Sequence, residues 1–226
     1  MLPALIAGNT YVLKHAPNVM GSAYLLLDVI KQAGLLDHVE QGVVEAFTEK
    51  FVEATRKLVM GDPLSEQTYL GPMARFDLRD ELDEQVQATL AEGATLLLGG
   101  RKADGVGNFY EPTVLADVTD QMTSFRQELF GPVASIITAR DARHALELAN
   151  DSEFGLASTI YTQDLELAAK LTEELDTGGV FINGVCASDP RVTFGGVKKS
   201  GFGRELSHFG VREFCNAQTV WLDRRG

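Results

Sequence analysis

An alternation of short apolar runs with amphipathic segments restricts the fold of this chain more than any other feature of the sequence. The apolar runs are rich in β-branched residues, as in buried strands, and the segments between them repeat apolar residues at helical spacing. This order is typical of an α/β fold with a mostly parallel sheet and crossover helices, predicted here over residues 41–205. The predicted strands are 94–100, 131–139, 157–162 and 178–183, and the predicted helices lie near 43–60, 74–92, 141–150 and 164–176.

The two ends of the chain add less regular units. TYVLK (10–14) is typical of a short buried strand, and a helical segment with Pro17 near its start and Gly34 at its end follows it. This helix leads into the next amphipathic segment without the strand that should follow a crossover helix, so the first βα unit is isolated. At the other end, VREFCNAQTVWLD (211–223) alternates loosely and is predicted to be a final strand that needs a partner edge.

Composition and charge disfavour several classes of partner. The formal net charge of −12 disfavours nucleic acid and anionic membranes, because the field of the whole protein repels phosphate groups. No apolar run approaches the roughly 20 residues of a membrane span, and the N-terminal residues lack the basic start of a secretory signal. Two cysteines, Cys186 and Cys215, are too few for a disulfide framework. We therefore expect a soluble, cytoplasmic protein.

The glycine-rich stretch FGGVKKSGFGRE (194–205) is the most unusual local composition in the chain. It has neither the residue order of a Walker loop nor that of a dinucleotide fingerprint placed between a strand and a helix. The residues alone favour a tight connection with several turns, and a phosphate-binding loop remains the alternative. The four histidines lack the paired spacing of metal ligands, so no metal site is expected.

Two side chains are candidates for chemistry, each with an ordinary alternative. Cys186 follows an apolar strand and would be reactive if a neighbouring cation lowered the pKa of its thiol; otherwise it is a small buried side chain. Glu128, in RQELFGP, could accept hydrogen bonds from the vicinal hydroxyls of a sugar, or it could be an ordinary surface acid. The residues alone leave both alternatives open.

Several stretches taken together resemble the NAD(P)-dependent aldehyde dehydrogenase family, in the order and spacing of its C-terminal half. They cover practically the whole chain, and they are most similar to the bacterial succinate-semialdehyde dehydrogenase branch. The resembling stretches are ALIAGNTYVLKHAPN at the start, MGDP (60–63), LGPMARFD (70–77), FYEPTVLADVT (109–119), ELFGPV (128–133), LANDSEFGLASTIYT (148–162) and FGGVKKSGFGRE (194–205).

The resemblance implies a set of cofactor-binding residues for NAD or NADP. Lys14 resembles the lysine that contacts the adenosine ribose, and Glu128 resembles the glutamate that holds the nicotinamide ribose. Phe130 corresponds to the aromatic residue beside the nicotinamide. Pro17 stands where the family often has a glutamate that selects NAD, so the preference between NAD and NADP stays open.

The resemblance also implies residues on the side of a small-molecule aldehyde. Phe194 is expected near the aldehyde pocket, and the VCASD loop with Cys186 and Ser188 lies at the substrate entrance. Ser188 is the residue that could meet a carboxylate-bearing substrate such as succinate semialdehyde. Asn183 is similar to an asparagine that supports the site.

The family's catalytic motifs have no counterpart in this sequence. They are the nucleophilic cysteine of G-Q-x-C, the basic glutamate of E-L-G-G and the asparagine of W-N-F-P, so no catalytic residue is assigned. The family's long segment with most of the Rossmann strands is also missing, because its flanks are joined directly near residues 38–43. The resemblance therefore implies an aldehyde oxidoreductase whose shortened chain is inactive and binds NAD or NADP weakly or not at all.

The resemblance divides the chain into three parts: a remnant of the cofactor domain (1–40), a catalytic-type α/β domain (41–205) and an oligomerisation tail (206–226). We expect a homo-oligomer formed through the C-terminal strand. Apolar surface on the first helix, at Leu25, Leu26, Val29 and Ile30, would add to self-association. Two alternatives to a shortened enzyme remain. One is a non-catalytic binding module that pairs with full-length subunits, and the other is a working enzyme of which this sequence is a part.

Overall fold

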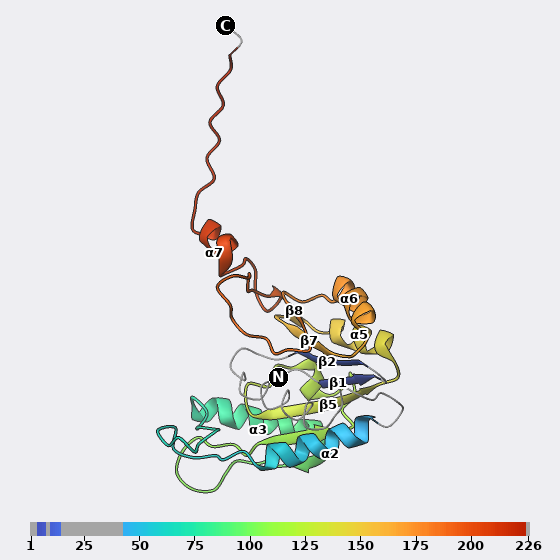
Figure 1. Ribbon diagram of the computed structural model, residues 1–226. Helices are drawn as coiled ribbons and strands as arrows, with labels where there is room; N and C mark the ends of the chain where they lie inside the picture. Colours follow the sequence, from blue (N-terminus) through green and yellow to red (C-terminus); the bar gives the residue numbers. More distant parts are fainter. Residues whose placement is uncertain (1–3, 8–9, 15–42, 225–226) are drawn as a thin grey trace.

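A seven-stranded mixed sheet forms the centre of the molecule (Figure 1). The computed structural model describes residues 4–7, 10–14 and 43–224. Strand order in the sheet is β3-β4-β5-β1-β2-β7-β8, and the short strands β6 and β9 pair with each other outside it. The strands are β1 (Ala4–Ala7), β2 (Thr10–Lys14), β3 (Thr95–Leu98), β4 (Thr113–Ala116), β5 (Val133–Ala139), β6 (Phe154–Gly155), β7 (Ser158–Tyr161), β8 (Val180–Ile182) and β9 (Val197–Lys198).

The α/β fold class is confirmed, with a sheet that is more mixed than the expected one. The pairs β4–β5, β5–β1 and β7–β8 are parallel, whereas β3–β4, β1–β2 and β2–β7 are antiparallel. β1 and β2 form an antiparallel hairpin that lies between β5 and β7, so residues 4–7 and 10–14 share a sheet with the strands of the predicted second domain. The hairpin accounts for two of the antiparallel pairs, because β2 runs against both of its neighbours.

The four predicted helices are confirmed, and two short helices were not predicted. The N-terminal ends of α5 and α6 lie where Asp141 and Asp164 accept hydrogen bonds from the backbone N–H groups of His144 and Leu167. The unpredicted helices are too short to show periodicity. The helices are α2 (Val43–Arg56), α3 (Phe76–Ala91), α4 (Thr123–Arg126), α5 (Ala142–Asn150), α6 (Leu165–Glu174) and α7 (Ser207–Glu213).

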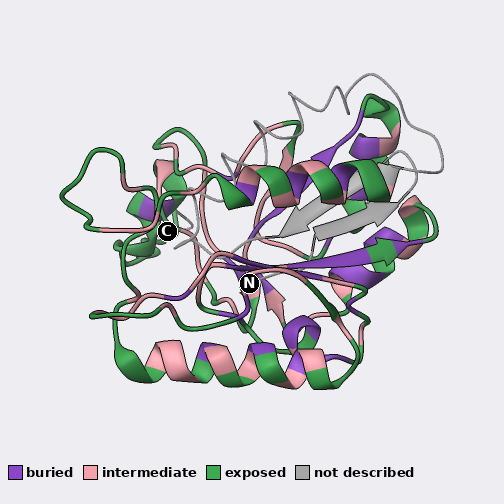
Figure 2. Ribbon diagram, turned by 90° about the horizontal axis from the view of Figure 1, so that it is seen from below, coloured by how far each residue is buried: buried purple, intermediate pink, exposed green. Residues whose placement is uncertain are grey.

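The main hydrophobic cluster joins buried residues of α3, α5 and α6 to side chains on one face of the sheet. Figure 2 shows that the helices are buried on one side and exposed on the other. Side chains of β5 alternate between the two faces: Val133 and Ile137 belong to this cluster, whereas Ile136 and Thr138 line a groove of about 740 Å³ beside α2. β5 is therefore buried on both sides, as expected for a central strand.

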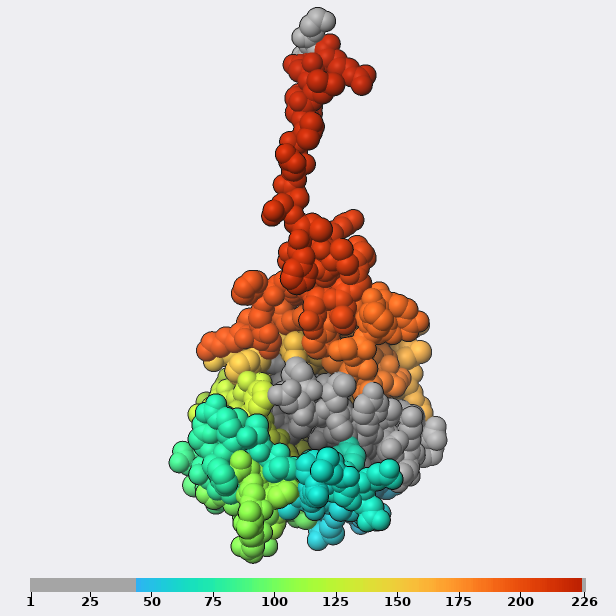
Figure 3. Space-filling model, turned by 90° about the vertical axis from the view of Figure 1, so that its left-hand side faces the viewer, coloured from blue at the N-terminus to red at the C-terminus, as the bar shows by residue number. Residues whose placement is uncertain are grey.

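The C-terminal segment departs from the predicted strand. Val211–Glu213 is the end of α7, and residues 216–224 form no strand. Figures 1 and 3 show this segment projecting away from the rest of the molecule. The side chains of Phe214 and Trp221 are exposed. A strand requires hydrogen bonds from a neighbouring strand, and the described part of the chain provides none for the tail. The strand predicted at 10–14 is confirmed as β2, which pairs with β1 and β7. The helix predicted between Pro17 and Gly34 lies outside the described residues.

Leu82 provides a test of the main cluster. Its side chain is 1% exposed, on the face of α3 that packs on the sheet. Leu82→Ala should lower the free energy of unfolding by about 2–5 kcal/mol, because it leaves a cavity in the cluster. Leu64→Ala, at a side chain that is 90% exposed, should change it by less than about 0.5 kcal/mol. Urea unfolding followed by circular dichroism measures both, and equal effects would contradict this description of the core.

Candidate functional site

Glu128 and Phe130 lie together at a surface cleft of about 430 Å³, here named the Glu128 cleft. One wall comes from α3, a second from the segment that follows α4, and a third from the turn before β7. An apolar cavity of about 250 Å³ adjoins it and shares Leu78 and Phe130 with it. The lining residues of the Glu128 cleft are Leu78, Glu81, Gln85, Arg126, Gln127, Glu128, Phe130, Glu153 and Phe154.

Helix α3 holds the segment that carries Glu128. At one end, the Glu92 carboxylate accepts hydrogen bonds from the backbone N–H and the hydroxyl of Thr123, at 2.6 and 2.7 Å. Further along α3, the Gln85 side-chain amide donates to the Glu128 carbonyl oxygen at 3.4 Å and to the Gln127 side chain at 3.0 Å. The position of Glu128 is therefore set by a helix that precedes it by 43 residues along the chain.

The free groups of this cleft suit a sugar with a planar ring attached. The Glu128 carboxylate makes no hydrogen bond or ion pair with any described residue, so both oxygens can accept hydrogen bonds from ligand hydroxyls. Phe130 is 46% exposed and offers an aromatic surface beside it. These properties are compatible with the expected contact to the nicotinamide riboside part of NAD or NADP, which stays a prediction.

Lys14 is the third residue predicted to bind the cofactor. It lies on β2, where it is paired in register with Ser158 of β7. Its side chain lies outside the described residues, so a contact with the adenosine ribose stays a prediction.

The three residues predicted on the substrate side lie between β8 and β9, and none is among the described lining residues of the Glu128 cleft. Cys186 is 3% exposed, and this burial raises the pKa of its thiol. Ser188 is exposed on the same loop. Phe194 is half-buried, and its backbone exchanges hydrogen bonds of 2.9 and 2.7 Å with that of Glu205. Their contact with an aldehyde stays a prediction.

The two alternatives for Cys186 are distinguished by its surroundings. A reactive thiol needs a lowered pKa, whereas burial among apolar groups disfavours the charged thiolate. The structure thus supports the small buried side chain. Cys215 is exposed, and its thiol donates a hydrogen bond of 3.4 Å to the carbonyl of Val211.

The cations of the glycine-rich stretch are bound to the protein itself. Lys198 pairs with Asp176 at 3.1 Å and Lys199 pairs with Glu153 at 2.6 Å. Arg204 donates hydrogen bonds to two backbone carbonyl oxygens within the same loop. These charges hold the loop in place and are not collected around a common anion position, so the structure favours the tight connection over the phosphate-binding loop.

Glycine is required where the loop meets the preceding turn. A Cβ atom at Gly178 would lie 1.6 Å from the carbonyl oxygen of Gly195, far below any permitted contact. The two backbones therefore touch directly, and a side chain at Gly178 would separate them.

The described part of the chain holds no group of three or more histidine, cysteine, aspartate or glutamate side chains arranged to bind a metal ion. Among the same residues, no helix combines the length and the apolarity of a membrane span.

Residues 37–220 match the family model described as "Aldehyde dehydrogenase family". The chain belongs to the aldehyde dehydrogenase family. It is 46% identical to the succinate semialdehyde dehydrogenase [NAD(P)+] Sad of Escherichia coli (strain K12), over 99% of this chain and 68% of that protein. It is also 46% identical to a succinate-semialdehyde dehydrogenase [NADP(+)] of Mycolicibacterium paratuberculosis, over 81% of this chain.

The similarity extends to solved structures of this family of dehydrogenases. Succinic semialdehyde dehydrogenase from Streptococcus pyogenes, in complex with NADP+, superposes with a TM-score of 0.75 at 35% identity, over 79% of this chain and 39% of that one. This chain also spans 39% of the Mycolicibacterium paratuberculosis protein. The alignment with the Escherichia coli protein runs over 314 residues although this chain has 226, so that relative has residues inside the matched region that this chain lacks.

The two thiols should differ in reactivity. Ellman's reagent at neutral pH should modify one thiol per chain rapidly, because Cys215 is exposed, and the second only after denaturant is added, because Cys186 is buried. Cys215→Ser should remove the rapid phase, and Cys186→Ser should leave it unchanged. A rapid phase that survives in Cys215→Ser would show that Cys186 is a reactive thiol after all.

Proposed function

We propose that this chain is a shortened NAD(P)-dependent aldehyde dehydrogenase of the succinate-semialdehyde type. The whole enzyme of this type oxidises succinate semialdehyde to the carboxylic acid in the cytoplasm, and the 226-residue chain has no turnover of its own. The observation that carries the first part is the Glu128 cleft, with its free carboxylate and exposed aromatic ring, in a chain 46% identical to succinate-semialdehyde dehydrogenases.

The chemistry of aldehyde oxidation supports the second part. A thiolate adds to the aldehyde, hydride then leaves for the nicotinamide ring, and a base activates water to release the acid. The motifs that supply the thiolate and the base in the family are missing from this sequence. Burial raises the pKa of Cys186, so this thiol is a poor substitute. The additional residues of the Escherichia coli relative inside the matched region are where we place the missing machinery.

An assay of the purified chain with succinate semialdehyde and NAD or NADP tests this proposal. We expect no reduced cofactor above the background without protein, because loss of the nucleophile alone typically costs a factor of about 10⁴–10⁶ in rate. A complete succinate-semialdehyde dehydrogenase serves as the positive control. Turnover at a rate near that of the control would show that the chain carries a working nucleophile, and Cys186→Ser and Cys215→Ser would then identify it.

A second candidate function is that of a non-catalytic module that assembles with itself or with full-length subunits. The observation that favours it is the tail, where large apolar side chains project into solvent beyond α7 (Figure 3). The exposed fractions are 93% for Phe214, 85% for Val220, 83% for Trp221 and 76% for Leu222. Apolar side chains in an extended segment without a partner strand are suited to pairing with the sheet edge of another chain.

The tail should therefore determine the state of assembly. Sedimentation of the intact chain at micromolar concentration should show a species above the monomer mass, because the apolar tail gains burial in an oligomer. A chain that ends after Cys215 keeps α7 and should be a monomer. Lys170→Ala, on the outer surface of α6, is a control that should leave the assembly unchanged. A stable monomer of the intact chain would contradict the assembly proposal.

A further inference from the structure

The turn formed by residues 150–155 contacts three separate parts of the molecule: the end of α6, the segment that carries Glu128 and the glycine-rich loop. Asn150 is the first residue of this turn. The side-chain amide of Asn150 donates to the carbonyl of Glu174 at 2.8 Å, and its side-chain oxygen accepts from the N–H of Asp176 at 2.9 Å. Its backbone carbonyl accepts from the Lys198 ammonium group at 2.8 Å. Asn150 therefore fixes the end of α5 to the end of α6 and to the glycine-rich loop.

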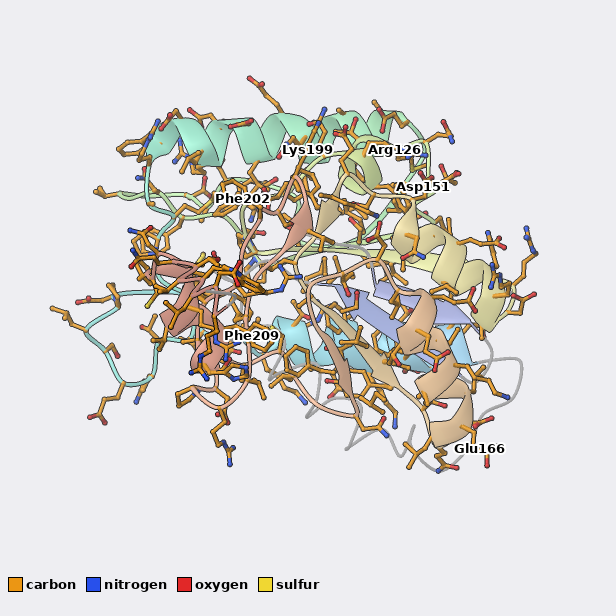
Figure 4. The ribbon with its side chains drawn as sticks, turned by 90° about the horizontal axis from the view of Figure 1, so that it is seen from above. Arg126, Asp151, Glu166, Lys199, Phe202 and Phe209 are labelled. Atoms are coloured by element: carbon orange, nitrogen blue, oxygen red, sulfur yellow. The ribbon has the colours of Figure 1, made fainter. Side chains whose placement is uncertain are left out.

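Asp151 connects the same turn to the segment that carries Glu128. Its two carboxylate oxygens accept hydrogen bonds of 3.0 and 2.9 Å from the two terminal nitrogens of Arg126 (Figure 4). This is a bidentate pair, the geometry in which an arginine restricts both position and orientation. The Arg126 guanidinium also lies 5.0 Å from the ring centre of Phe125, which is buried. Arg126 precedes Glu128 by two residues, so the pair acts on the backbone next to the cleft.

Glu153, Phe154 and Gly155 of the turn contact the glycine-rich loop. The Glu153 carbonyl accepts from the N–H of Lys199 at 2.9 Å, in addition to their side-chain ion pair. The N–H of Gly155 donates to the Ser200 hydroxyl at 3.0 Å. Glu153 and Phe154 are also lining residues of the Glu128 cleft, so one side of the turn faces the cleft while its other contacts hold the loop.

We infer that the 150–155 turn sets the position of Glu128 relative to the glycine-rich loop, and that Asn150 and Asp151 are positioning residues for the cofactor site. That the positioned site binds the nicotinamide riboside part of a cofactor rests on the proposed function. The positioning itself rests only on the contacts above. In a two-substrate enzyme, such a turn would keep the cofactor wall and the loop with Phe194 in a fixed relation.

The Arg126–Asp151 pair is exposed to water, so it can position the segment around Glu128 without contributing much to the free energy of unfolding. Arg126 and Asp151 are 40% and 51% exposed, so water screens their attraction and the pair adds little to the stability of the whole chain. Breaking the pair should therefore loosen the segment around Glu128 without unfolding the sheet.

Amide hydrogen exchange of the full chain, followed by mass spectrometry, tests the inference. Asp151→Asn should speed exchange in residues 123–130 by about two- to tenfold, since it weakens a charged, bidentate pair. Asn150→Ala removes the side-chain bonds that fix the turn to the end of α6 and keeps the backbone carbonyl that binds Lys198, so it should speed exchange in 123–130 and in 174–177. Peptides from β5 and β7 should keep their rates in both variants, which verifies that the fold is intact.

Glu147→Gln is a matched control, because Glu147 is also an exposed carboxylate on α5 paired with an arginine, Arg143, at 3.4 Å. It should leave both segments at the rates of the unaltered chain. The inference is wrong if Asp151→Asn does not change 123–130, or if it changes this segment and the β5 and β7 peptides equally.

The same exchange measurement with added nucleotide distinguishes this inference from the proposed function. NAD or NADP at millimolar concentration, high enough to detect the weak binding expected of this shortened chain, should slow exchange in 123–130 of the unaltered chain. Asp151→Asn should reduce this protection, whereas Glu147→Gln should not. If neither nucleotide protects the unaltered chain, the cofactor assignment of the cleft fails. The ligand-free comparison then still decides whether the turn positions the segment.

Discussion

Burial of β5 on both faces is the constraint on which the rest of this structure depends. Ile137 packs into the cluster formed with α3, α5 and α6, and Ile136 faces the groove beside α2. The segment with Glu128 and Phe130 leads directly into β5, so the C-terminal end of this segment is fixed by the core. The N-terminal end of the same segment follows α4, whose first turn is held by the Glu92 carboxylate. The cleft thus depends on β5 and α3, and the Glu128 carboxylate has no hydrogen-bond or ion-pair partner among the described residues.

Sequence periodicity predicted the four longer helices, because their apolar residues repeat over several turns. It also indicated the long run at β5 and the buried run at β7, but it did not predict β4, although most of that short strand is buried. α4 is a single turn held mainly by a carboxylate from α3, which no local pattern indicates. The tail was predicted as a strand from its alternation, but alternation indicates a strand only where a partner edge exists.

The same limit applies to the site. Glu128 and Phe130 could be proposed from the sequence because they lie in one short motif, and the structure brings them to one cleft. Gln85, Asp151 and Asn150 were missed because each acts on a segment that lies 24 to 48 residues away along the chain. The glycine-rich loop also required coordinates: its lysines are paired with Asp176 and Glu153, and only those partners distinguish a packed connection from an anion site.

Under the proposed function, binding and chemistry would use different residues of this chain. Glu128 and Phe130, the proposed contacts of a nicotinamide riboside, depend for their position on β5 and α3. The motifs that would supply the nucleophile and the base by resemblance to the family do not occur in this sequence. Because catalysis requires both sets at one place, the first set alone would lower the free energy of a bound ligand without lowering the barrier to its oxidation.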